Sequence, residues 1–397
     1  MKVLMMHMQG SGIGYYRHTV PARALANAGT EAYYTAGMSN FFLDMKDAGE
    51  NVDQWLMDHA AEYDVIHAGY TTNQAQNTML VAIREMVYKT TGYEIPLIID
   101  IDDDLYNVPT YNTSYKAYTP AKETRQTAIV GLRAADAVTV STPKLADLVK
   151  HDARRVGVLP NYADPKDWPT VIRDPRRSED KSIRLMFAGG QSHLGDLSEK
   201  EDTIHAIMEH YDGTGGKPMV RLFFLGCMPP WVKRYMSDKT DPRKNRCFFI
   251  HPHEVSVYHK ALCWIQPDIL WAPVAHNTFN ESKSLIKSYD AAMSGAAFIC
   301  DDWPTYADVP KDCAVKVFSP YEWKEGLSAL IEDPTLRHKL HSRLHQWVLD
   351  ERTIDSQISK WTDFYEEVLA GDKVRQISDV VRPRIIRPGE HDGDSPI

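Results

Sequence analysis

Short apolar segments alternate along this chain with longer segments whose apolar positions recur every three to four residues. Segments of the first kind have the length of strands, and those of the second kind have the period of helices. The first half of the chain is predicted to form strands at Val3–His7, Ala32–Thr35, Val65–Ala68, Leu97–Ile101, Ala137–Val140 and Val156–Leu159, and helices at Tyr16–Ala28, Thr78–Tyr88, Glu123–Ala134 and Pro143–Val149. Such alternation is typical of βα units around a parallel sheet.

The alternation stops at Asp164–Lys181, where prolines lie among charged residues as in a linker. A second series follows, with strands at Ile183–Ala188, Arg221–Leu225, Cys247–Ile250, Ile269–Pro273, Ala296–Ile299 and Val315–Phe318, and helices at Glu199–Tyr211, Val255–Ala261, Leu285–Met293, Tyr321–Leu330, Pro334–Val348 and Thr353–Leu369. We therefore expect an α/β protein with two Rossmann-like domains, at 1–170 and 171–350, that face each other across a cleft. A helix at 351–372 is expected to cross back to the first domain, and residues 373–397 to form a flexible tail.

Composition narrows the class of protein. The chain has 397 residues, of which 43% are apolar and 25% charged, as in soluble globular proteins. No apolar stretch is long enough to cross a bilayer, so a cytoplasmic protein without membrane insertion is expected. The five cysteines are widely spaced, which favours buried thiols over a zinc or redox motif. The net charge of −9 argues against a basic surface that binds nucleic acid over its whole extent.

Open parallel sheets bind ligands beyond the carboxyl ends of their strands, so motifs at those ends are candidate sites. The first is Gln9–Arg17, which follows the first strand and opens a helix. Glycines let a backbone approach a ligand, and a helix N-terminus offers free N–H groups. Gly12, Gly14 and Arg17 are therefore predicted to cradle an anion such as a sugar diphosphate, with a tight turn that binds nothing as the alternative. The glycine spacing is not a dinucleotide fingerprint, so a nicotinamide cofactor is not expected.

A second motif, Asp100–Tyr106, places four carboxylates at the end of an apolar strand. Because these charges repel one another, a purely structural role is hard to justify. Asp102 and Asp103 are the preferred pair for a base or for binding an acceptor in the cleft. Helix capping with solvation, and a divalent metal at Asp100–Asp104, are the alternatives, and the metal is not expected.

A third motif, Phe187–Leu197, repeats the order of strand, glycines and helix in the second half of the chain. Its backbone amides at Gly190, together with His193, are predicted to meet a diphosphate from the side opposite the first motif. A histidine with a structural role is the alternative.

The fourth motif is Phe279–Gly295. Asn280 or Ser282 is expected to cap a helix whose first amides, at Lys283 and Ser284, bind an anion. Lys287 lies one turn after Lys283 on the same face, and Asp290 is placed to accept hydrogen bonds from ribose hydroxyls. A solvated amphipathic helix is the alternative.

With these motifs located, the chain from about Met1 to Leu369 resembles the GT-B glycosyltransferases of the large retaining family 4. The resemblance is strongest in Phe279–Gly295 and in the strand Ala297–Asp302 that follows. In that family a Glu-x7-Glu motif spans this helix, which implies that Asp290 stands for the acid that holds the donor ribose. Ser282 stands where the family has a carboxylate that contacts the transferred sugar. A phage and bacterial subset is more similar still in Gly-x-Gly-Tyr-Tyr-Arg, in Leu159–Asn161, in Gly-Gly-x-Ser-His-x-x-Asp-Leu and in Asn-x-x-Lys-Ser-x-x-Lys.

The resemblance implies a hexosyl- or pentosyltransferase that moves a sugar from a UDP- or GDP-type donor to a hydroxyl with retention, and that needs no obligatory cofactor. The expected residues are Asp102, Asp103 and His193 for catalysis, Gly12, Gly14, Arg17, Gly190, His193, Ser282, Lys283, Ser284, Lys287 and Asp290 for the donor, and Tyr15, Tyr16, Asp102, Asp103 and Tyr106 for the acceptor. An epimerase of the same fold and a non-catalytic binding module are the rival functions.

The acceptor is left open by the sequence. Hydroxymethylated pyrimidines in phage DNA and surface glycans are the two main possibilities. Arg154–Arg155, Arg176–Arg177 and Arg382–Arg387 are basic segments that would be needed to contact DNA, and ordinary surface solvation is the alternative interpretation of them.

Overall fold

The computed structural model describes residues 1–7, 12–36, 60–119, 122–170, 182–236, 245–251 and 254–371. The expected tail, most of the predicted linker and residues 9–11 of the first motif lie outside these ranges. The described chain forms two six-stranded sheets in which every pair of neighbouring strands is parallel. The prediction of two Rossmann-like α/β domains is therefore confirmed.

All of the predicted strands are present, with ends that differ by no more than two residues. The first sheet consists of β1 (Lys2–His7), β2 (Glu31–Ala36), β3 (Val65–Gly69), β4 (Leu97–Ile101), β5 (Ala137–Val140) and β6 (Val156–Val158). The second consists of β7 (Ile183–Gly189), β8 (Val220–Gly226), β9 (Cys247–Ile250), β10 (Ile269–Ala272), β11 (Ala297–Asp301) and β12 (Val315–Val317).

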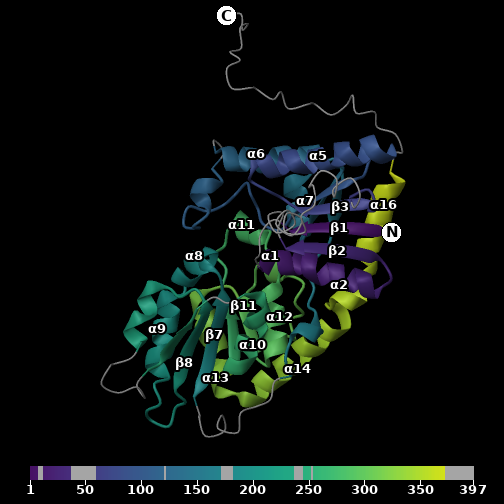
Figure 1. Ribbon diagram of the computed structural model, residues 1–397. Helices are drawn as coiled ribbons and strands as arrows, with labels where there is room; N and C mark the ends of the chain where they lie inside the picture. Colours follow the sequence, from purple (N-terminus) through teal and green to yellow (C-terminus); the bar gives the residue numbers. More distant parts are fainter. Residues whose placement is uncertain are drawn as a thin grey trace, which may run out of the picture.

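The order of strands reverses once in each sheet. The first sheet has the order β2-β1-β3-β4-β5-β6, so the chain leaves β1 for β2 and then returns to the other side of β1. The second has the order β12-β11-β10-β7-β8-β9, with the same reversal between β7 and β10. Because the connections diverge at such points, a crevice opens at the carboxyl ends of these strands. Figure 1 shows the two sheets one above the other, with α1 (Gly12–Gly14) and α11 (Thr278–Glu281) at the junction.

Helices cover both faces of the first sheet, which explains its continuous apolar strands. Along β1, Leu4 and Met6 pack with α5 (Gln74–Thr91), α6 (Glu123–Ala134) and α7 (Pro143–Val149). Val3 and Met5 point to the opposite face, because side chains alternate along a strand. There they pack with α2 (Val20–Asn27) and α16 (Ser359–Ala370), whose Trp361 is fully buried.

The second sheet is covered in the same way. Leu185 and Phe187 of β7 face α9 (Glu201–His210) and α13 (Pro320–Glu332). Met186 and Ala188 face α10 (Val255–Ile265), α12 (Ile286–Ser294) and α14 (Pro334–Glu351). All five cysteines are buried thiols, as the sequence predicted. Among the helices described, none has the length and apolar character that a membrane span requires.

Two of the predicted helices are divided because the chain changes its winding inside them. The expected helix Tyr16–Ala28 begins as α1, widens into a π-helical turn, η1 (Tyr15–Thr19), and continues as α2. The last expected helix divides into α15 (Ile354–Gln357) and α16. In the fourth motif the predicted helix Leu285–Met293 is present as α12, and the short helix α11 precedes it. The remaining short helices are η2 (Tyr115–Ala117), η3 (Pro165–Asp167), η5 (Gln191–His193), α8 (Leu194–Ser198), η6 (Pro230–Tyr235) and η8 (Pro304–Tyr306).

The π-helical turn points Arg17 into the interior of the first domain. Its guanidinium forms a two-pronged ion pair with Asp100 at the end of β4, with Nη2–Oδ1 at 2.6 Å and Nε–Oδ2 at 2.9 Å, and the two side chains are 0% and 2% exposed. Arg17 also donates to the carbonyl of Leu159 and to Asn161 Oδ1. Burial alone would raise the pKa of Asp100, but the charge and hydrogen bonds of Arg17 outweigh it and the pKa is lowered.

Replacing Arg17 by Met should destabilise the protein strongly, because Asp100 would remain buried without a counter-ion. We expect the free energy of unfolding of the first domain to fall by about 3–5 kcal/mol in urea titrations followed by circular dichroism. The double substitution Arg17→Met with Asp100→Leu removes both charges and should recover much of the loss. Lys166→Met breaks an exposed pair with Asp355 and should cost under about 1 kcal/mol. An Arg17→Met protein as stable as the parent would contradict the assignment.

Candidate functional site

A pocket of about 580 Å³ lies between the two domains and is lined by residues of both. Its position follows from the topology, since Gly12 and Ile13 follow β1 while Gly189, Gly190 and Val274 lie at the ends of β7 and β10. These are the strands at which the order of each sheet reverses. The volume is in the range of pockets that bind cofactors and substrates.

Ten of the fifteen residues predicted for the site line this pocket. They come from all four motifs and are Gly12, Tyr16, Asp102, Asp103, Gly190, His193, Lys283, Ser284, Lys287 and Asp290. Gly14, Tyr15, Arg17, Tyr106 and Ser282 are not among its lining residues.

Arg17 and Ser282 have structural partners instead of a place in the pocket. Arg17 was expected to bind an anion, but Asp100 already neutralises its buried guanidinium. Ser282 is also buried, and its hydroxyl donates to the carbonyl oxygen of Phe279 at 2.7 Å. Neither side chain is therefore free to bind a donor.

Gly14, Tyr15 and Tyr106 were also expected at the site, and the structure places them outside the pocket lining. Gly14 is buried within α1. The Tyr15 hydroxyl donates to the Asp167 carboxylate, and the Tyr106 hydroxyl donates to Asp152 Oδ2 at 2.6 Å. Burial raises the pKa of both phenols, so they remain protonated donors in these bonds.

The carboxylates of the Asp-rich strand end have separate partners. Asp100 pairs with Arg17, and Asp104 accepts from the backbone N–H of Tyr106 at 2.7 Å, as a turn-capping aspartate does. No group of three or more potential metal ligands occurs in the described ranges of the chain. The mutual repulsion expected among these carboxylates is thus reduced, because Asp100 and Asp104 each have a partner of their own.

Asp102 and Asp103 are the two carboxylates of this motif that line the pocket. Asp102 Oδ1 accepts from Asn161 Nδ2 at 3.1 Å, and burial is the main reason that its pKa is raised. Asp103 Oδ1 lies 3.4 Å from Lys283 Nζ on the opposite domain. Asp102 is thus held by a residue of its own domain, whereas Asp103 pairs with the C-terminal domain across the cleft.

Glycines at the ends of β7 and β8 form a floor on which backbone atoms are exposed to the pocket. Gly226 has φ of +98°, and a Cβ there would lie 2.5 Å from the carbonyl oxygen of Gly189. A Cβ at Gly189 would lie 2.8 Å from Lys287 Nζ, which donates to the Ala188 carbonyl at 2.7 Å. Burial lowers the pKa of Lys287. A side chain at Gly189 would displace Lys287 Nζ, and one at Gly226 would clash with the Gly189 backbone.

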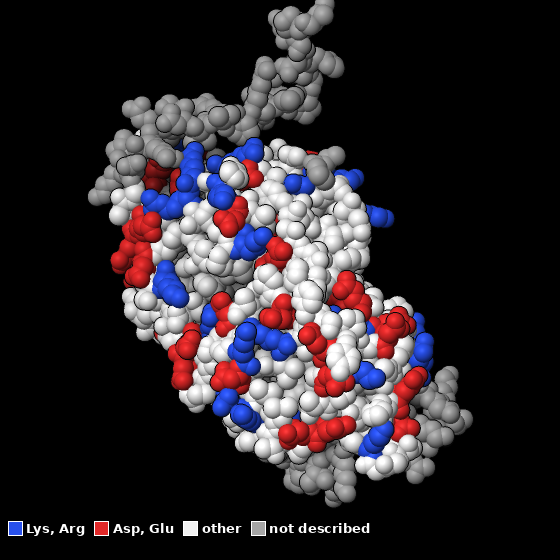
Figure 2. Space-filling view, turned by 180° about the vertical axis from the view of Figure 1, so that it is seen from behind, with Lys and Arg blue, Asp and Glu red and all other residues white. Residues whose placement is uncertain are grey.

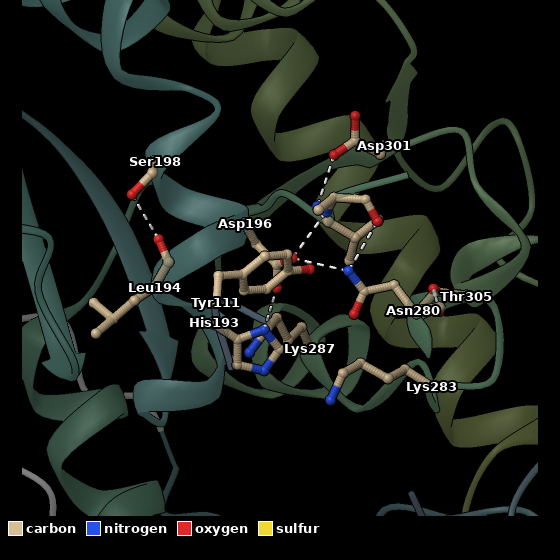
Figure 3. A network of polar contacts seen from close by, with 12 residues as sticks. Tyr111, His193, Leu194, Asp196, Ser198, Asn280, Lys283, Lys287, Asp301 and Thr305 are labelled. Carbon is tan, nitrogen blue, oxygen red and sulfur yellow. Dashed lines mark hydrogen bonds and ion pairs between the residues drawn. The ribbon is translucent and has the colours of Figure 1, made fainter. Parts of the chain in front are cut away.

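His193 is held by a buried carboxylate. Its Nδ1 lies 2.7 Å from Asp196 Oδ2, while Asp196 Oδ1 accepts from Asn280 Nδ2 and from the backbone N–H of Ala275, each at 2.8 Å. In Figure 3 the ring of His193 and the side chains of Lys283 and Lys287 lie together on one side of this network. Burial, followed by the charge of Lys287, lowers the pKa of His193 to about 4. The ring is therefore neutral at pH 7, with Nδ1–H donating to Asp196 and Nε2 available as an acceptor.

Asp290 is a buried carboxylate with one unsatisfied oxygen. Its Oδ2 accepts from the Tyr258 hydroxyl at 2.7 Å, whereas Oδ1 is buried and has no hydrogen-bond partner among the described residues. Burial raises its pKa to about 6. His259, also in the lining, has an unsatisfied Nε2 and a pKa lowered by burial to about 4. Buried polar atoms are usually paired, so these two indicate a ligand with hydrogen-bond donors.

The fourth motif contains two helices, α11 and α12, and neither of the two expected capping residues caps the N-terminus of one of them. Asn277, not Asn280 or Ser282, is the capping residue: its Oδ1 accepts from the backbone N–H of Asn280 at 3.0 Å and caps α11. The helical path is then interrupted, and α12 begins at Ile286. The first N–H groups of α12, close to Ser284, have no partner within the helix and are available to an anion.

Three contacts hold the segment before α12 to the N-terminal domain. Lys144 pairs with Glu281 at 2.7 Å, and the Thr142 hydroxyl donates to the Ser282 carbonyl at 2.8 Å. The Asp103–Lys283 pair is the third. The amides at the start of α12 are thereby positioned by both domains.

Sequence reasoning did not identify the residues that α10 contributes. Val255, Tyr258 and His259 line the pocket, but this helix has the ordinary amphipathic pattern of a core helix and carries no glycine-rich turn. Thr305 and Tyr306 of η8 were also not identified. Asp196 is visible in the third motif as an acid three residues after His193, and that spacing was the available signal for its role.

No family model matches the chain, and no curated protein matches its sequence. Solved structures do share its fold. Sucrose-phosphate synthase from Thermosynechococcus elongatus matches 94% of this chain and 100% of its own, with 12% identity and a TM-score of 0.60. HepE from Anabaena, solved with UDP and glucose, matches 92% of this chain and 100% of its own, with 13% identity and a TM-score of 0.60. A glycosyltransferase from Rickettsia africae matches 94% and 99%, with 12% identity and a TM-score of 0.58. The two-domain arrangement is thus the GT-B fold.

The lowered pKa of His193 predicts a pH dependence of stability. An unfolded chain binds a proton at this residue near pH 6.5, and the folded chain does so only near pH 4, so the stability that His193 contributes is lost as the pH falls from 6.5 to 4. In His193→Asn we expect this loss to be smaller by up to about 1.4 kcal/mol per pH unit. Urea titrations at several pH values measure it. His210→Asn, at an exposed histidine, should leave the dependence unchanged, and an unchanged dependence in His193→Asn would refute the assignment.

Proposed function

We propose that this protein is a glycosyltransferase of the family 4 type, which transfers a hexosyl or pentosyl group from a nucleoside diphosphate sugar to a hydroxyl with retention of configuration. The observation that carries the proposal is that glycine backbone from both domains and two lysines of the C-terminal domain line one pocket. HepE shares the fold, and its structures contain UDP, UDP with glucose, and UDP-glucose. These ligands favour a uridine donor.

The diphosphate fits best at the start of α12. Helix N-termini bind anions because unpaired N–H groups and the helix dipole act together. Lys283 and the backbone at Gly189 and Gly190 lie around the same volume. Asp290, with its unsatisfied Oδ1, is placed to accept hydrogen bonds from ribose hydroxyls, although its side chain is one methylene shorter than the Glu of the resembling family.

Transfer requires stabilisation of the charge that grows on the departing diphosphate. Fixed amides and the ammonium of Lys283 provide it without reorganisation. The bond between the sugar anomeric carbon and the phosphate oxygen breaks, the bond to the acceptor oxygen forms on the same face, and the leaving oxygen takes the acceptor proton. Asp102 and Asp103 orient the acceptor hydroxyl. His193, neutral and oriented by Asp196, accepts a hydrogen bond from a hydroxyl of the substrates through Nε2.

A nucleotide-sugar-binding protein without transfer is the second candidate. It is favoured by Ser282, whose buried hydroxyl donates to the Phe279 carbonyl, whereas the resembling family has at this position a carboxylate that contacts the transferred sugar. The two functions share the donor site and differ in turnover.

A donor panel tests the proposal. UDP-, GDP-, ADP- and dTDP-sugars should be compared by thermal unfolding, and a UDP-sugar should give the largest rise in Tm. A ligand at about 100 times its Kd stabilises the native state by about 2.7 kcal/mol. Release of UDP from UDP-glucose then separates the two candidates, because only a transferase turns over the donor. If no nucleotide sugar shifts Tm, both are wrong.

Substitution of Asp290 tests its contact with ribose. In Asp290→Asn we expect the Kd for UDP to rise about tenfold, because a charged acceptor is lost. The Kd for 2′,3′-dideoxy-UDP should change little. In the parent, UDP affinity should fall as the pH drops below about 6, where Asp290 takes up a proton, and Asp290→Asn should lack this dependence. Isothermal titration calorimetry measures the Kd for UDP, the Kd for the dideoxy analogue and the pH dependence of UDP binding. Asp302→Asn, at an exposed aspartate, is the control, and equal weakening of both ligands would argue against a ribose contact.

A further inference from the structure

The wall that the N-terminal domain contributes to the pocket is acidic. Its described lining residues are Gly12, Ile13, Tyr16, Asp102 and Asp103. None of these is a cation, and both lysines of the described lining come from the C-terminal domain. If the C-terminal domain holds the donor, as proposed above, the acceptor must approach this acidic wall.

The charged groups of the described lining leave no positive charge for a second anion. Three carboxyl groups, those of Asp290 and of the two acidic residues just named, face the two ammonium groups. His193 and His259 add no charge at neutral pH, because burial lowers the pKa of each to about 4. A bound diphosphate takes up the lysine charge and adds negative charge of its own. An acceptor that carries a phosphate near its reactive hydroxyl would therefore be repelled.

The same wall is well suited to hydroxyl groups. An ionised carboxylate accepts hydrogen bonds and donates none. The hydroxyl groups of a sugar can supply the donors that it needs. Asp102 is fixed by Asn161, with Nδ2–Oδ1 at 3.1 Å. The Asp103 side chain is 39% exposed and pairs with Lys283 across the cleft, with Nζ–Oδ1 at 3.4 Å. When Lys283 turns to a diphosphate, Asp103 gains free acceptor oxygens beside the donor.

The described surface on one face of the molecule shows no basic groove of the kind that binds nucleic acid. On the face in Figure 2, Lys and Arg are interspersed with Asp and Glu rather than gathered into a basic stripe. Of the basic segments noted in the sequence, Arg154 lies 3.9 Å from Asp136, and Arg155 donates to the backbone of Glu367 at 2.6 Å. The other two segments lie outside the described residues. Binding to DNA needs several cations that are free to contact phosphates.

From this distribution of charge we infer that the acceptor is an uncharged polyhydroxyl compound, a sugar or the end of a glycan, which Asp102 and Asp103 bind through its hydroxyls. The inference rests on the proposed function and specifies the acceptor of that same site. It assigns to Asp103 a role in specificity: it binds neutral hydroxyl acceptors and repels phosphorylated ones.

Matched pairs of acceptors test the inference with UDP-glucose as donor. Glycerol is compared with glycerol 3-phosphate, and methyl glucoside with methyl glucoside 6-phosphate, by UDP release above the hydrolysis rate. A single-stranded oligonucleotide that contains 5-hydroxymethylcytosine is the third kind of acceptor. We expect kcat/KM to be at least about tenfold higher for the neutral member of each pair, since like charges at this range cost more than 1.4 kcal/mol.

Asp103→Asn gives an independent readout. It should raise KM for the neutral acceptors and reduce the preference for the neutral member by about tenfold, because the repelling charge is removed. The Kd for UDP should not rise, because the substitution releases Lys283 from its ion pair and leaves it free to bind the diphosphate. Asp147→Asn, at an exposed aspartate on α7, should change neither quantity.

The outcomes distinguish failure of the acceptor inference from failure of the proposed function. Transfer to the oligonucleotide or to a phosphorylated acceptor at rates equal to or above those of the neutral ones would overturn the acceptor class and leave the glycosyltransferase proposal standing. An unchanged preference in Asp103→Asn would also overturn it, as would failure of every neutral acceptor to raise UDP release. Failure of every nucleotide sugar in the donor panel to bind would overturn the proposed function, and this inference with it.

Discussion

The buried ion pair between Arg17 and Asp100 is the contact on which the N-terminal half of the site depends. It joins the turn after β1 to the end of β4, and through the Leu159 carbonyl and Asn161 it also fixes the chain after β6. Removing either charge alone would leave the other unpaired in a nonpolar interior, which costs several kcal/mol. Gly12 and Asp102, which lie close in sequence to the two partners, are thereby brought into one pocket wall.

Parallel topology determines where the other half of the site lies. In each sheet the strand order reverses once, and the two reversals face each other across the domain boundary. The segment before α12 is then held to the opposite domain through Glu281, Ser282 and Lys283. Amides at the start of α12 are thus oriented by contacts that only the assembled domains provide.

The two walls differ in charge, and this difference underlies the proposed function. Lysines, helix amides and glycine backbone on the C-terminal side favour a diphosphate, whereas carboxylates on the N-terminal side favour neutral hydroxyl groups. Burial adjusts the titratable groups between them, since it lowers the pKa of His193 and raises that of Asp290. Donor and acceptor can then meet without competing for the same charges.

The sequence by itself determined the twelve strands, the two domains and the positions of the four motifs, because these depend on local apolar periodicity and on glycine and proline. These motifs contain His193, Lys283, Lys287 and Asp290, which line the pocket. Only the tertiary structure decided that Arg17 is neutralised by a carboxylate far away in sequence, that Thr142 of the other domain donates to the Ser282 carbonyl, and that Tyr258 and His259 of an ordinary amphipathic helix reach the pocket. Whether a polar side chain is free or already paired depends on partners that distant segments supply. The local sequence pattern does not reveal those partners.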